Sequence, residues 1–384
     1  MMKSPSKIYL LMMALVASFL LASCGIVGGG TTTVKIGLLS PQTGPIAVYA
    51  PGFEDAANVA VSGLNEANDD YVFELIVVDS GCDGTQAATS AQSLIDSGVV
   101  GIVGAACSGA TLGAIAVAAP AGVPMVSYAS TSPAISTADD DGYLFRVVPS
   151  DAQQSVALAD VVKSMGDSNP AVLFMTNDYG AGLGENFKAA MGSLCTEIGY
   201  DPTEGSYDAS TLAQAVVDGG CDSVVLISYA TDGAAIMEEL LSQGFSGSLY
   251  GADGLADAAL TQSFTDVAAV DGLVATKPRP GESSTAKSSF ETAYAAAGGN
   301  PEGIYTNETF DAVNLVAAAV MADSNDDLRD DLVSLGSSYD GASGVHTFDS
   351  NGDVPGTGYE ICEFSGANFS CSKIWTSSGG VSGK

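Results

Sequence analysis

The chain has 384 residues, of which 45 are acidic and 12 basic, so its formal net charge at pH 7 is −33. This length is sufficient for two lobes, each with its own hydrophobic core. A surface this acidic repels the phosphate backbone of nucleic acids, which argues against DNA or RNA as a partner.

Residues 1–24 have the form of an export signal. Lys3 and Lys7 give it a basic start, and residues 8–21 form a nearly continuous apolar run that is too short to span a membrane. The run ends in Leu-Ala-Ser-Cys, which resembles a bacterial lipobox and implies cleavage before Cys24 and lipid attachment to it. The alternative is an ordinary signal peptide with an incidental cysteine. We therefore expect a lipid-anchored protein of the periplasm or cell surface.

Segments typical of strands and helices alternate through the first half of the chain. Apolar runs rich in β-branched residues predict strands, and small or apolar residues at helical spacing predict helices. We expect strands at 34–40, 73–79, 99–105, 124–128 and 143–148, and helices at 50–67, 85–96 and 112–119. This alternation favours an α/β fold with a parallel, doubly wound sheet.

The same alternation restarts after Pro149 and predicts a second lobe of the same class. We expect helices at 152–165, 183–195, 234–243, 283–297 and 309–322, and strands at 171–175, 223–227, 248–251, 346–348 and 359–364. Asn351-Gly352 indicates a hairpin turn between the last two strands. The aspartate-rich stretch 323–331 is predicted to be solvated surface, residues 25–33 a flexible tether, and residues 377–384 a mobile Gly/Ser tail.

The stretch 98–111 is the first pointer to a functional site. A short apolar run, typical of a buried strand, ends in Cys-Ser-Gly-Ala-Thr, and a helix-like segment follows. This order places Ser108 at a helix N-terminus, where unpaired amides suit an anion such as a carboxylate. Ligands of open parallel sheets bind outside the carboxyl ends of the strands, and this stretch is such an end. The alternative is tight packing of small residues.

The cysteines point to disulfides. Apart from Cys24 there are six, an even number in a chain predicted to be exported. Their positions in the sequence suggest three disulfides, Cys82–Cys107, Cys362–Cys371 and Cys195–Cys221, although spacing alone does not fix the connectivity. No Cys-x-x-Cys occurs and His346 is the only histidine, so we expect neither a metal site nor a cofactor. The Asp-x-Asn-x-Asp run at 349–353 lacks the remainder of a calcium loop.

Several ordered fragments resemble the branched-chain amino-acid-binding proteins that serve ABC importers, in the type I periplasmic-binding-protein superfamily. They include Cys-Ser-Gly-Ala-Thr at 107–111 and Asn-Asp-Tyr-Gly at 177–180. The other matching fragments are 36–45, 122–127, 131–133, 145–146 and 251–254. The fragments occur in the family's order and cover nearly the whole chain after the export signal.

The resemblance implies two Rossmann-like lobes joined by three crossovers, with a ligand held between them. We expect the crossovers near Pro149, at 276–280 and at 339–345. The expected lobes are 34–149 with 277–340 for lobe 1, and 150–276 with 341–376 for lobe 2.

The resemblance also implies roles for individual residues. Ser108 and Thr131 match positions that bind the carboxylate of an α-amino acid, while the Ala129 carbonyl, the Thr131 hydroxyl and Asp253 match acceptors for its ammonium. Some relatives have a glutamate at this position, and the aspartate side chain is shorter. The alternative interpretation of Asp253 is a turn residue before Gly254 with no role in binding. The aromatic wall of the pocket is expected to consist of Tyr49, Tyr179 and Tyr229, with Tyr305 as a further candidate. Tyr128 differs from the small residue or proline that relatives often have at its position, so we expect it to change the depth or specificity of the pocket. The Cys82–Cys107 pair matches a family disulfide.

From the resemblance we expect capture of an α-amino acid, branched-chain or aliphatic (Leu, Ile or Val), and its delivery to an ABC transporter permease. An enzyme is the weaker reading, because a nucleophilic Ser108 needs a base and His346 lies in a distant predicted strand. The third reading is a ligand-sensing module of the same fold for an amide, a short peptide or an aromatic acid.

Overall fold

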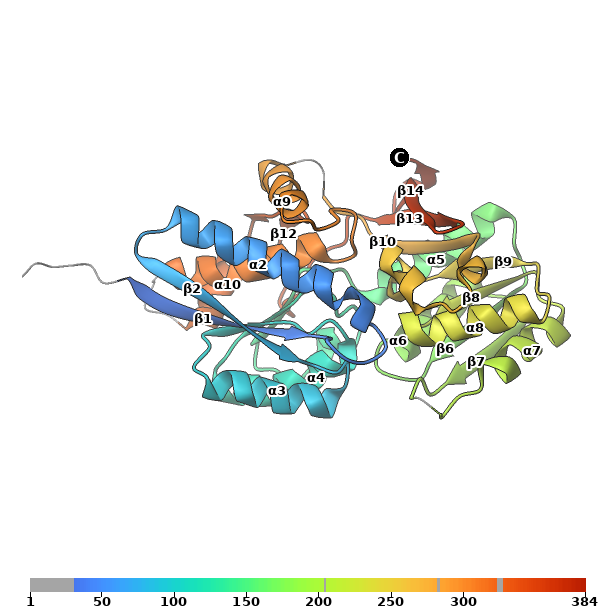
Figure 1. Cartoon of the computed structure of the whole chain (residues 1–384), viewed down its shortest axis with the longest axis horizontal. Helices are drawn as coiled ribbons and strands as arrows, with labels where there is room; N and C mark the ends of the chain where they lie inside the picture. The colour runs from blue at the N-terminus through green and yellow to red at the C-terminus, as the bar shows by residue number, and fades with distance from the viewer. Residues whose placement is uncertain (1–30, 204, 282–283, 323–326) are drawn as a thin grey trace, which may run out of the picture.

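The computed structural model describes residues 31–203, 205–281, 284–322 and 327–384. The expected export signal, Cys24 and most of the expected tether lie outside the described residues. The described chain forms two lobes that lie side by side, with the last helices returning to the first lobe (Figure 1). Among the described residues, no helix has the length and apolar character needed to cross a membrane.

Lobe 1 is built on a five-stranded parallel sheet in the order β2-β1-β3-β4-β5. Its strands are β1 (Thr32–Ser40), β2 (Tyr71–Asp79), β3 (Gly101–Val103), β4 (Met125–Ser127) and β5 (Leu144–Arg146). All five were predicted from their apolar runs, which are fully buried in β3, β4 and β5, whereas β2 is mostly half-buried. β3 is shorter than expected, since Gly104 leaves the strand with φ +128 and a Cβ there would lie 2.8 Å from the Leu39 Cβ.

Helices cover both faces of this sheet, with α3 and α4 packed together on one side and α2 and α10 on the other (Figure 1). The helices are α2 (Ala50–Ala67), α3 (Gly84–Asp96), α4 (Ser108–Ala118), α9 (Thr285–Ala296), α10 (Thr306–Ala322) and α11 (Leu328–Leu335), with short 3-10 turns at Ala47–Tyr49, Ala119–Ala121 and Ile135–Thr137. The α2 prediction is confirmed at both ends. α4 starts four residues earlier than expected, because the extended residue Cys107 caps it and Ser108 is already helical.

Lobe 2 is built on an eight-stranded mixed sheet in the order β15-β14-β13-β10-β9-β8-β6-β7. Its strands are β6 (Pro170–Met175), β7 (Thr196–Tyr200), β8 (Ser223–Ile227), β9 (Ser248–Gly251), β10 (Leu273–Pro278), β13 (Tyr359–Ser365), β14 (Asn368–Thr376) and β15 (Gly380–Gly383). Strands β6 to β10 are parallel, and β13 to β15 add an antiparallel end. Its helices are α5 (Asp151–Met165), α6 (Gly180–Met191), α7 (Ala209–Gly219) and α8 (Ala230–Ser242), with 3-10 turns at Asp253–Leu255, Ala258–Ser263 and Val267–Val270.

Five helices and strands of lobe 2 were missing from the sequence prediction: β7, α7, β10, β14 and β15. The helix expected at 183–195 ends at Met191, because Gly192 turns the chain with φ +85 and β7 begins at Thr196. β7 is an edge strand of mixed polarity, and β10 carries a buried lysine, Lys277, so neither has the apolar run that marks a strand.

The expected hairpin across Asn351-Gly352 is wrong. β12 (Val345–His346) pairs with β11 (Tyr339–Asp340), whereas β13 pairs with β10 and β14. The turn itself exists, with the Gly352 N–H donating to the Asp349 carbonyl, but it does not join paired strands. The stretch 377–384, expected to be a mobile tail, contains β15 at the edge of the lobe 2 sheet. In the aspartate-rich stretch, the described residues 327–331 begin α11.

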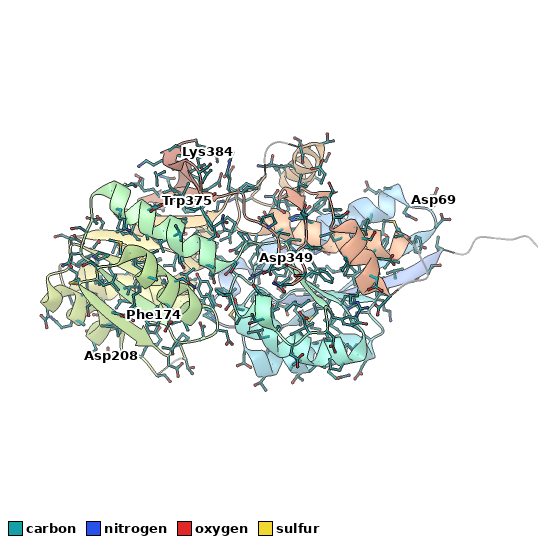
Figure 2. All side chains as sticks on the ribbon, turned by 180° about the vertical axis from the view of Figure 1, so that it is seen from behind. Asp69, Phe174, Asp208, Asp349, Trp375 and Lys384 are labelled. Carbon is teal, nitrogen blue, oxygen red and sulfur yellow. A yellow bond between two sulfur atoms is a disulfide. The ribbon has the colours of Figure 1, made fainter. Side chains whose placement is uncertain are left out.

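The third crossover lies later than the expected 339–345. Residues up to Asp353 still contact lobe 1, where the Phe348 N–H donates to the Gly336 carbonyl and Asp353 pairs with Arg146. Figure 2 shows Asp349 of this segment near the middle of the molecule. Residues 341–353 therefore pack with lobe 1 rather than lobe 2, and the chain reaches lobe 2 between Asp353 and the start of β13.

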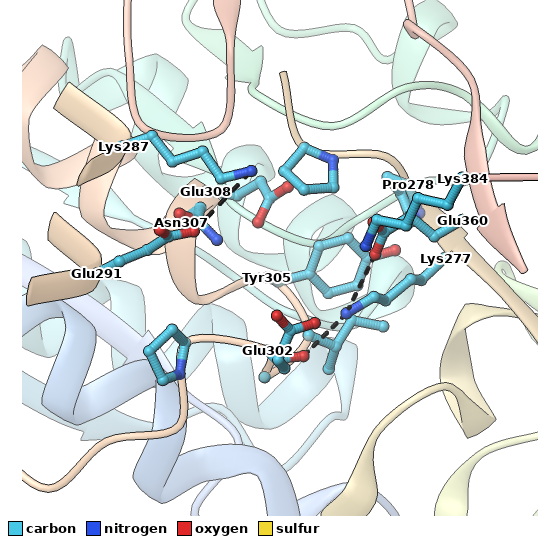
Figure 3. Close-up of a pocket in the computed structure, with 14 residues that line it drawn as sticks. Lys277, Pro278, Lys287, Glu291, Glu302, Tyr305, Asn307, Glu308, Glu360 and Lys384 are labelled. Atoms are coloured by element: carbon cyan, nitrogen blue, oxygen red, sulfur yellow. Dashed lines mark hydrogen bonds and ion pairs between the residues drawn. The ribbon is translucent and has the colours of Figure 1, made fainter. Parts of the chain in front are cut away.

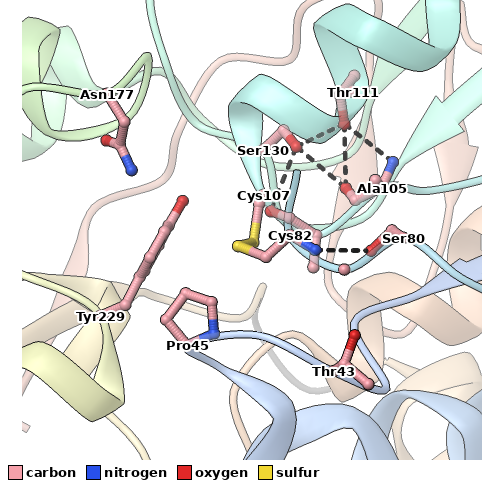
Figure 4. Close-up of a disulfide and its surroundings, with 12 residues drawn as sticks. Thr43, Pro45, Ser80, Cys82, Ala105, Cys107, Thr111, Ser130, Asn177 and Tyr229 are labelled. Carbon is pink, nitrogen blue, oxygen red and sulfur yellow. Dashed lines mark hydrogen bonds between the residues drawn. A yellow bond between two sulfur atoms is a disulfide. The ribbon is translucent and has the colours of Figure 1, made fainter. Parts of the chain in front are cut away.

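Three disulfides join Cys82 to Cys107, Cys195 to Cys221, and Cys362 to Cys371. The last links β13 and β14, as a hairpin would. The first disulfide does not lie between adjacent strands, because β1 lies between β2 and β3 in the sheet. The bond instead joins the loops that follow β2 and β3 (Figure 4).

Candidate functional site

A cavity lies between the lobes, at the carboxyl ends of the lobe 1 strands. It is lined by Ile46, Tyr49, Phe53, Ala106, Ser108 and Ala129 of the first half of the chain, by Tyr179, Tyr229, Asp253 and Gly254 of lobe 2, and by Ile304 and Tyr305 before α10. The lobes touch around it. The Tyr49 hydroxyl donates to the Gly254 carbonyl at 3.2 Å, and the Thr231 N–H and hydroxyl both donate to the Pro45 carbonyl at 3.1 Å. The structure is therefore a closed form.

Lobe 1 presents uncharged hydrogen-bond donors to this cavity. Ser108 is the first residue of α4, whose opening amides have no partner within the helix. Thr131 is buried, and neither its N–H nor its hydroxyl donates a hydrogen bond within the part of the chain that the structure describes. Unpaired N–H and O–H groups beside a cavity are suited to bind a carboxylate.

Buried hydroxyl groups hold the two loops that carry these donors. The Thr111 hydroxyl accepts from the Ala105 N–H at 2.9 Å and lies 2.7 Å from the Ser130 hydroxyl. The hydroxyls of Ser127 and Ser130 both donate to the Ala105 carbonyl, at 2.9 and 3.0 Å. This network links the end of β3 to the loop after β4 (Figure 4). The sequence analysis missed it, although the clustered hydroxyl residues at two strand ends were a signal.

Lobe 2 presents a carboxylate held by two tyrosines. Asp253 is 4 % exposed, and its two oxygens accept from the hydroxyls of Tyr179 at 2.7 Å and Tyr305 at 2.6 Å. Burial raises the pKa of Asp253, and these tyrosine hydrogen bonds oppose the rise. A carboxylate offers about four lone-pair sites, so Asp253 keeps capacity for a further donor. The Tyr179 ring stacks on Tyr229 with centroids 5.1 Å apart.

Asp151 is a second carboxylate that the sequence analysis missed. It is completely buried, and neither of its oxygens accepts a hydrogen bond from any described residue. Its pKa is raised well above the usual value, mainly by burial and further by the negative charge of Asp253, while the Thr131 hydroxyl and Arg146 oppose the rise. As the first residue of α5 it looks in sequence like an ordinary acidic helix start, so no pattern marks it.

Two buried carboxyl groups this close require a cation or a proton. Isolated buried charge is costly, and two like charges in one apolar site disfavour each other's ionisation. The raised pKa values of Tyr179, Tyr229 and Tyr305, whose causes include both Asp151 and Asp253, keep these hydroxyls uncharged. A ligand ammonium would satisfy both carboxyl groups at once.

The structure moves Tyr128 away from the expected aromatic wall. Its side chain is completely buried in the lobe 1 core, its ring lies 5.0 Å from Phe53, and its hydroxyl donates to the Leu39 carbonyl. It is not among the residues that line the cavity. The other expected aromatic residues, Tyr49, Tyr179, Tyr229 and Tyr305, do line it, as do Ser108, Ala129 and Asp253. The expected residue Thr131 and the unpredicted Asp151 are buried but are not among the lining residues.

The described residues that line the cavity with Ser108 include no histidine and no lysine. His346 lies on β12, where its Nε2 atom is 2.9 Å from the Ser343 hydroxyl and 3.0 Å from Asp311. Both contacts use the same ring nitrogen, so the group cannot relay a proton from serine to aspartate as a triad does. The one metal-like cluster in the described residues, Glu360 with Cys362 and Cys371, contains a disulfide.

A second pocket lies at the second crossover and gathers three lysines (Figure 3). Its cations are already paired: Lys277 donates to the Glu302 carbonyl at 2.8 Å, and Lys384 lies 2.6 Å from Glu360. Burial raises the pKa of Glu308 in this pocket to about 7. These contacts connect β10, the end of the chain after β15 and the loop before α10. Because the lysines are paired, little positive charge remains to bind an anion.

Comparison with known proteins agrees with this geometry. Residues 33–367 match a family model described as periplasmic binding protein, so the chain belongs to that family. It is 27% identical over 353 residues to the Leu/Ile/Val-binding protein homolog 3 of Brucella melitensis, covering 88% of this chain and 94% of the relative.

Solved structures show the same fold. The branched-chain amino acid transporter substrate binding protein of Streptococcus pneumoniae, in complex with isoleucine, superposes with a TM-score of 0.81 at 22% identity, over 90% of this chain and 100% of that one. A solute binding protein of R. palustris in complex with 4-hydroxybenzoate superposes with a TM-score of 0.76 at 16% identity, over 90% and 96%. The chain therefore has the type I periplasmic-binding-protein fold, and its family consists of solute-binding proteins.

Proposed function

We propose that this protein captures an α-amino acid with a branched-chain or aliphatic side chain and delivers it to an ABC importer without changing it chemically. The observation that carries the proposal is the buried carboxyl group of Asp253, which lines the cavity together with Ser108 of lobe 1 and interacts with the buried, unpartnered Asp151. A zwitterion has one charge that suits the carboxyl groups and one that suits the uncharged donors.

In this proposal, the ligand carboxylate accepts hydrogen bonds from the Ser108 hydroxyl at the start of α4 and from the Thr131 N–H in the loop after β4. The ammonium faces Asp253 and Asp151, with the Thr131 hydroxyl and Ala129 carbonyl as further acceptors. The ligand side chain lies against the apolar wall of the cavity, which consists of Ile46, Tyr49, Phe53, Tyr229 and Ile304. Ring faces and aliphatic groups suit a side chain that forms no hydrogen bonds.

The same pair of carboxyl groups argues against an aromatic acid such as the one bound by the R. palustris protein. A ligand without an ammonium leaves both carboxyl groups uncompensated, and its own negative charge adds repulsion. The name of the Brucella relative supports a Leu, Ile or Val ligand. Short peptides and the amides of amino acids retain an ammonium and remain the second candidates.

We further propose that the protein is exported and anchored by a lipid on Cys24. The lipobox-like ending of the apolar run supports this proposal. Cells making the Cys24→Ser variant should release the protein from the membrane fraction and show no incorporation of labelled fatty acid. Unchanged fractionation of the variant would remove the anchoring proposal.

Calorimetric titration with leucine, isoleucine and valine, and with the 2-oxo acid of each, tests the central proposal. We expect binding of at least one amino acid and no measurable binding of its 2-oxo acid, because the 2-oxo acid lacks the ammonium. Equal binding of an amino acid and its 2-oxo acid, or no binding of any aliphatic amino acid, would contradict the proposal.

A further inference from the structure

We propose that Arg146 is a positioning residue, which turns the N–H of Thr131 toward the ligand carboxylate without touching the ligand itself. This inference rests on the proposed function, because it explains how one hydrogen-bond donor to the ligand carboxylate is oriented. It adds a residue from β5 that does not line the cavity.

Arg146 is the largest side chain that is completely buried. Its Nη1 atom donates to the carbonyls of Ser132 at 2.9 Å and Ser130 at 3.4 Å, which flank Thr131. Its Nη2 atom donates to the Ser136 hydroxyl at 2.8 Å, and its Nε atom donates to Asp353 at 2.6 Å. Every arm of the guanidinium therefore has a partner.

The contact with the Ser130 carbonyl sets the direction of the Thr131 N–H. The peptide bond between them is trans, so its C=O and N–H point in opposite directions. Because the C=O points toward the guanidinium, the N–H points away from it. That N–H donates no hydrogen bond to any residue in the described part of the chain, which leaves it free for a ligand.

Other contacts hold the neighbouring peptides in the same arrangement. The Thr131 carbonyl accepts from the Asp151 N–H at 2.8 Å, and the Ser132 N–H donates to the Ser108 hydroxyl at 3.2 Å. Arg146 thus fixes two carbonyls on one side of the loop, while the groups assigned to the ligand lie on the other side.

The geometry requires the planar fork of arginine. Two carbonyls, a hydroxyl and a carboxylate are contacted in one plane, which a lysine ammonium cannot do. A buried guanidinium is costly unless it is fully paired, and the Ser136 hydroxyl closes the pairing by donating to the second oxygen of Asp353 at 2.6 Å. Ser136 lies in the 3-10 turn Ile135–Thr137 that follows the binding loop, so the ion pair of Arg146 with Asp353 also holds residues 349–353 against this part of lobe 1.

The experiment compares leucine with leucinamide, which keeps the ammonium and lacks the carboxylate. For the wild-type protein and the Arg146→Lys variant, the affinity for each is measured by competition against a labelled amino acid. We expect Arg146→Lys to weaken leucine binding about 10- to 30-fold and leucinamide binding about threefold or less, consistent with the loss of a hydrogen bond to a charged group. Equal losses for both compounds, or no loss, would overturn the inference.

Two further variants separate aiming from general stability. Ser136→Ala removes one neutral partner of the guanidinium, so it is expected to fold and to shift the leucine-to-leucinamide ratio in the same direction, to a smaller extent. Phe73→Leu lies in the core at the opposite edge of the lobe 1 sheet and should lower the melting temperature while leaving the ratio unchanged. An unchanged ratio in Ser136→Ala would count against the inference even if Arg146→Lys did not fold.

An error in the proposed function and an error in the role of Arg146 give different experimental results. If wild-type protein binds no α-amino acid, the ligand assignment is wrong. If wild-type protein binds leucine well above leucinamide but Arg146→Lys preserves that preference, only the role of Arg146 is wrong.

Discussion

The two walls of the cavity differ in charge. Lobe 1 contributes the start of α4 and the loop after β4, with the uncharged Ser108 in the lining and Thr131 buried in that loop. Lobe 2 contributes Asp253 and tyrosines to the lining, and Asp151 at the first crossover is buried where its charge acts on Asp253. This asymmetry fixes the orientation of a zwitterion, because only one of its two ends is compatible with each wall.

The largest effect is expected from the acidic wall. Asp253→Asn keeps the shape of the side chain but removes the charge that faces the ammonium, and its single amide oxygen can accept from only one of the Tyr179 and Tyr305 hydroxyls. We expect affinity for an amino acid to fall about 100-fold, or about 3 kcal/mol, measured by calorimetry. Asp218→Asn, an exposed site on α7, is the matched control and should bind as the wild-type protein does.

The second effect is a dependence of binding on pH. In the empty site, burial raises the pKa of both Asp151 and Asp253, so the pair retains a proton above the usual aspartate pKa of about 3.9. An incoming ammonium favours the ionised form of both groups, so binding releases a proton. Affinity therefore rises with pH between the usual and the raised pKa, by at most about tenfold per pH unit, and is constant above that range.

Titration in two buffers with different ionisation enthalpies measures the released proton. The other charged or titratable groups that face the pair are the Arg146 guanidinium and four tyrosines. Burial raises the pKa of each tyrosine well above its usual value, so these hydroxyls release no proton here; they are Tyr179, Tyr229, Tyr305 and Tyr359. Asp151→Asn should abolish the release. Heats that are independent of the buffer in the wild-type protein, at every pH, would show that the pair carries no such proton.

The third effect tests the uncharged wall. Ser108→Ala removes one donor but leaves the amides of α4 in place, so we expect about tenfold weaker binding of an amino acid. Ser90→Ala removes a partly buried hydroxyl that donates to the Asp79 carbonyl, away from the cavity, and serves as the control. A loss as large as that of Asp253→Asn would mean that the uncharged wall contributes as much as the acidic one.

The smallest effect concerns contact between the walls. Thr231→Val removes the hydroxyl bond to the Pro45 carbonyl and keeps the bond from the Thr231 N–H. The free energy that favours the closed form decreases by about 0.5–1 kcal/mol, so ligand affinity should fall about two- to fivefold. Stopped-flow experiments should show faster release of the ligand. Thr89→Val removes a hydroxyl bond within α3 alone and should leave both rates unchanged.

Much of the fold was predictable because each lobe repeats one pattern of buried strand and covering helix. α2 and β9 were predicted with their observed bounds, since their apolar patterns begin and end at clear signals. β7 and β10 were missed because their residues are mixed in polarity or include a buried lysine whose partners, Glu302 and Glu360, come from distant segments. The third crossover was misplaced because contacts of Asp353 with Arg146 across 207 positions leave no local signal.

The site was predictable where a residue belongs to a motif. Ser108 and Asp253 lie in fragments that resemble the family, and both line the cavity. Asp151 was missed because an acidic residue at a helix start is common for local reasons, and only its burial without partners distinguishes it. Tyr128 was misassigned because a strand end gives no indication of whether its side chain faces the cavity or the core.

A crystal structure of the protein with a bound aliphatic amino acid tests the central claim most directly. We predict the carboxylate within hydrogen-bonding distance of the Ser108 hydroxyl and the Thr131 N–H, with the ammonium between Asp151 and Asp253. A ligand bound in the reverse orientation, or bound outside the cavity between the lobes, would contradict the account.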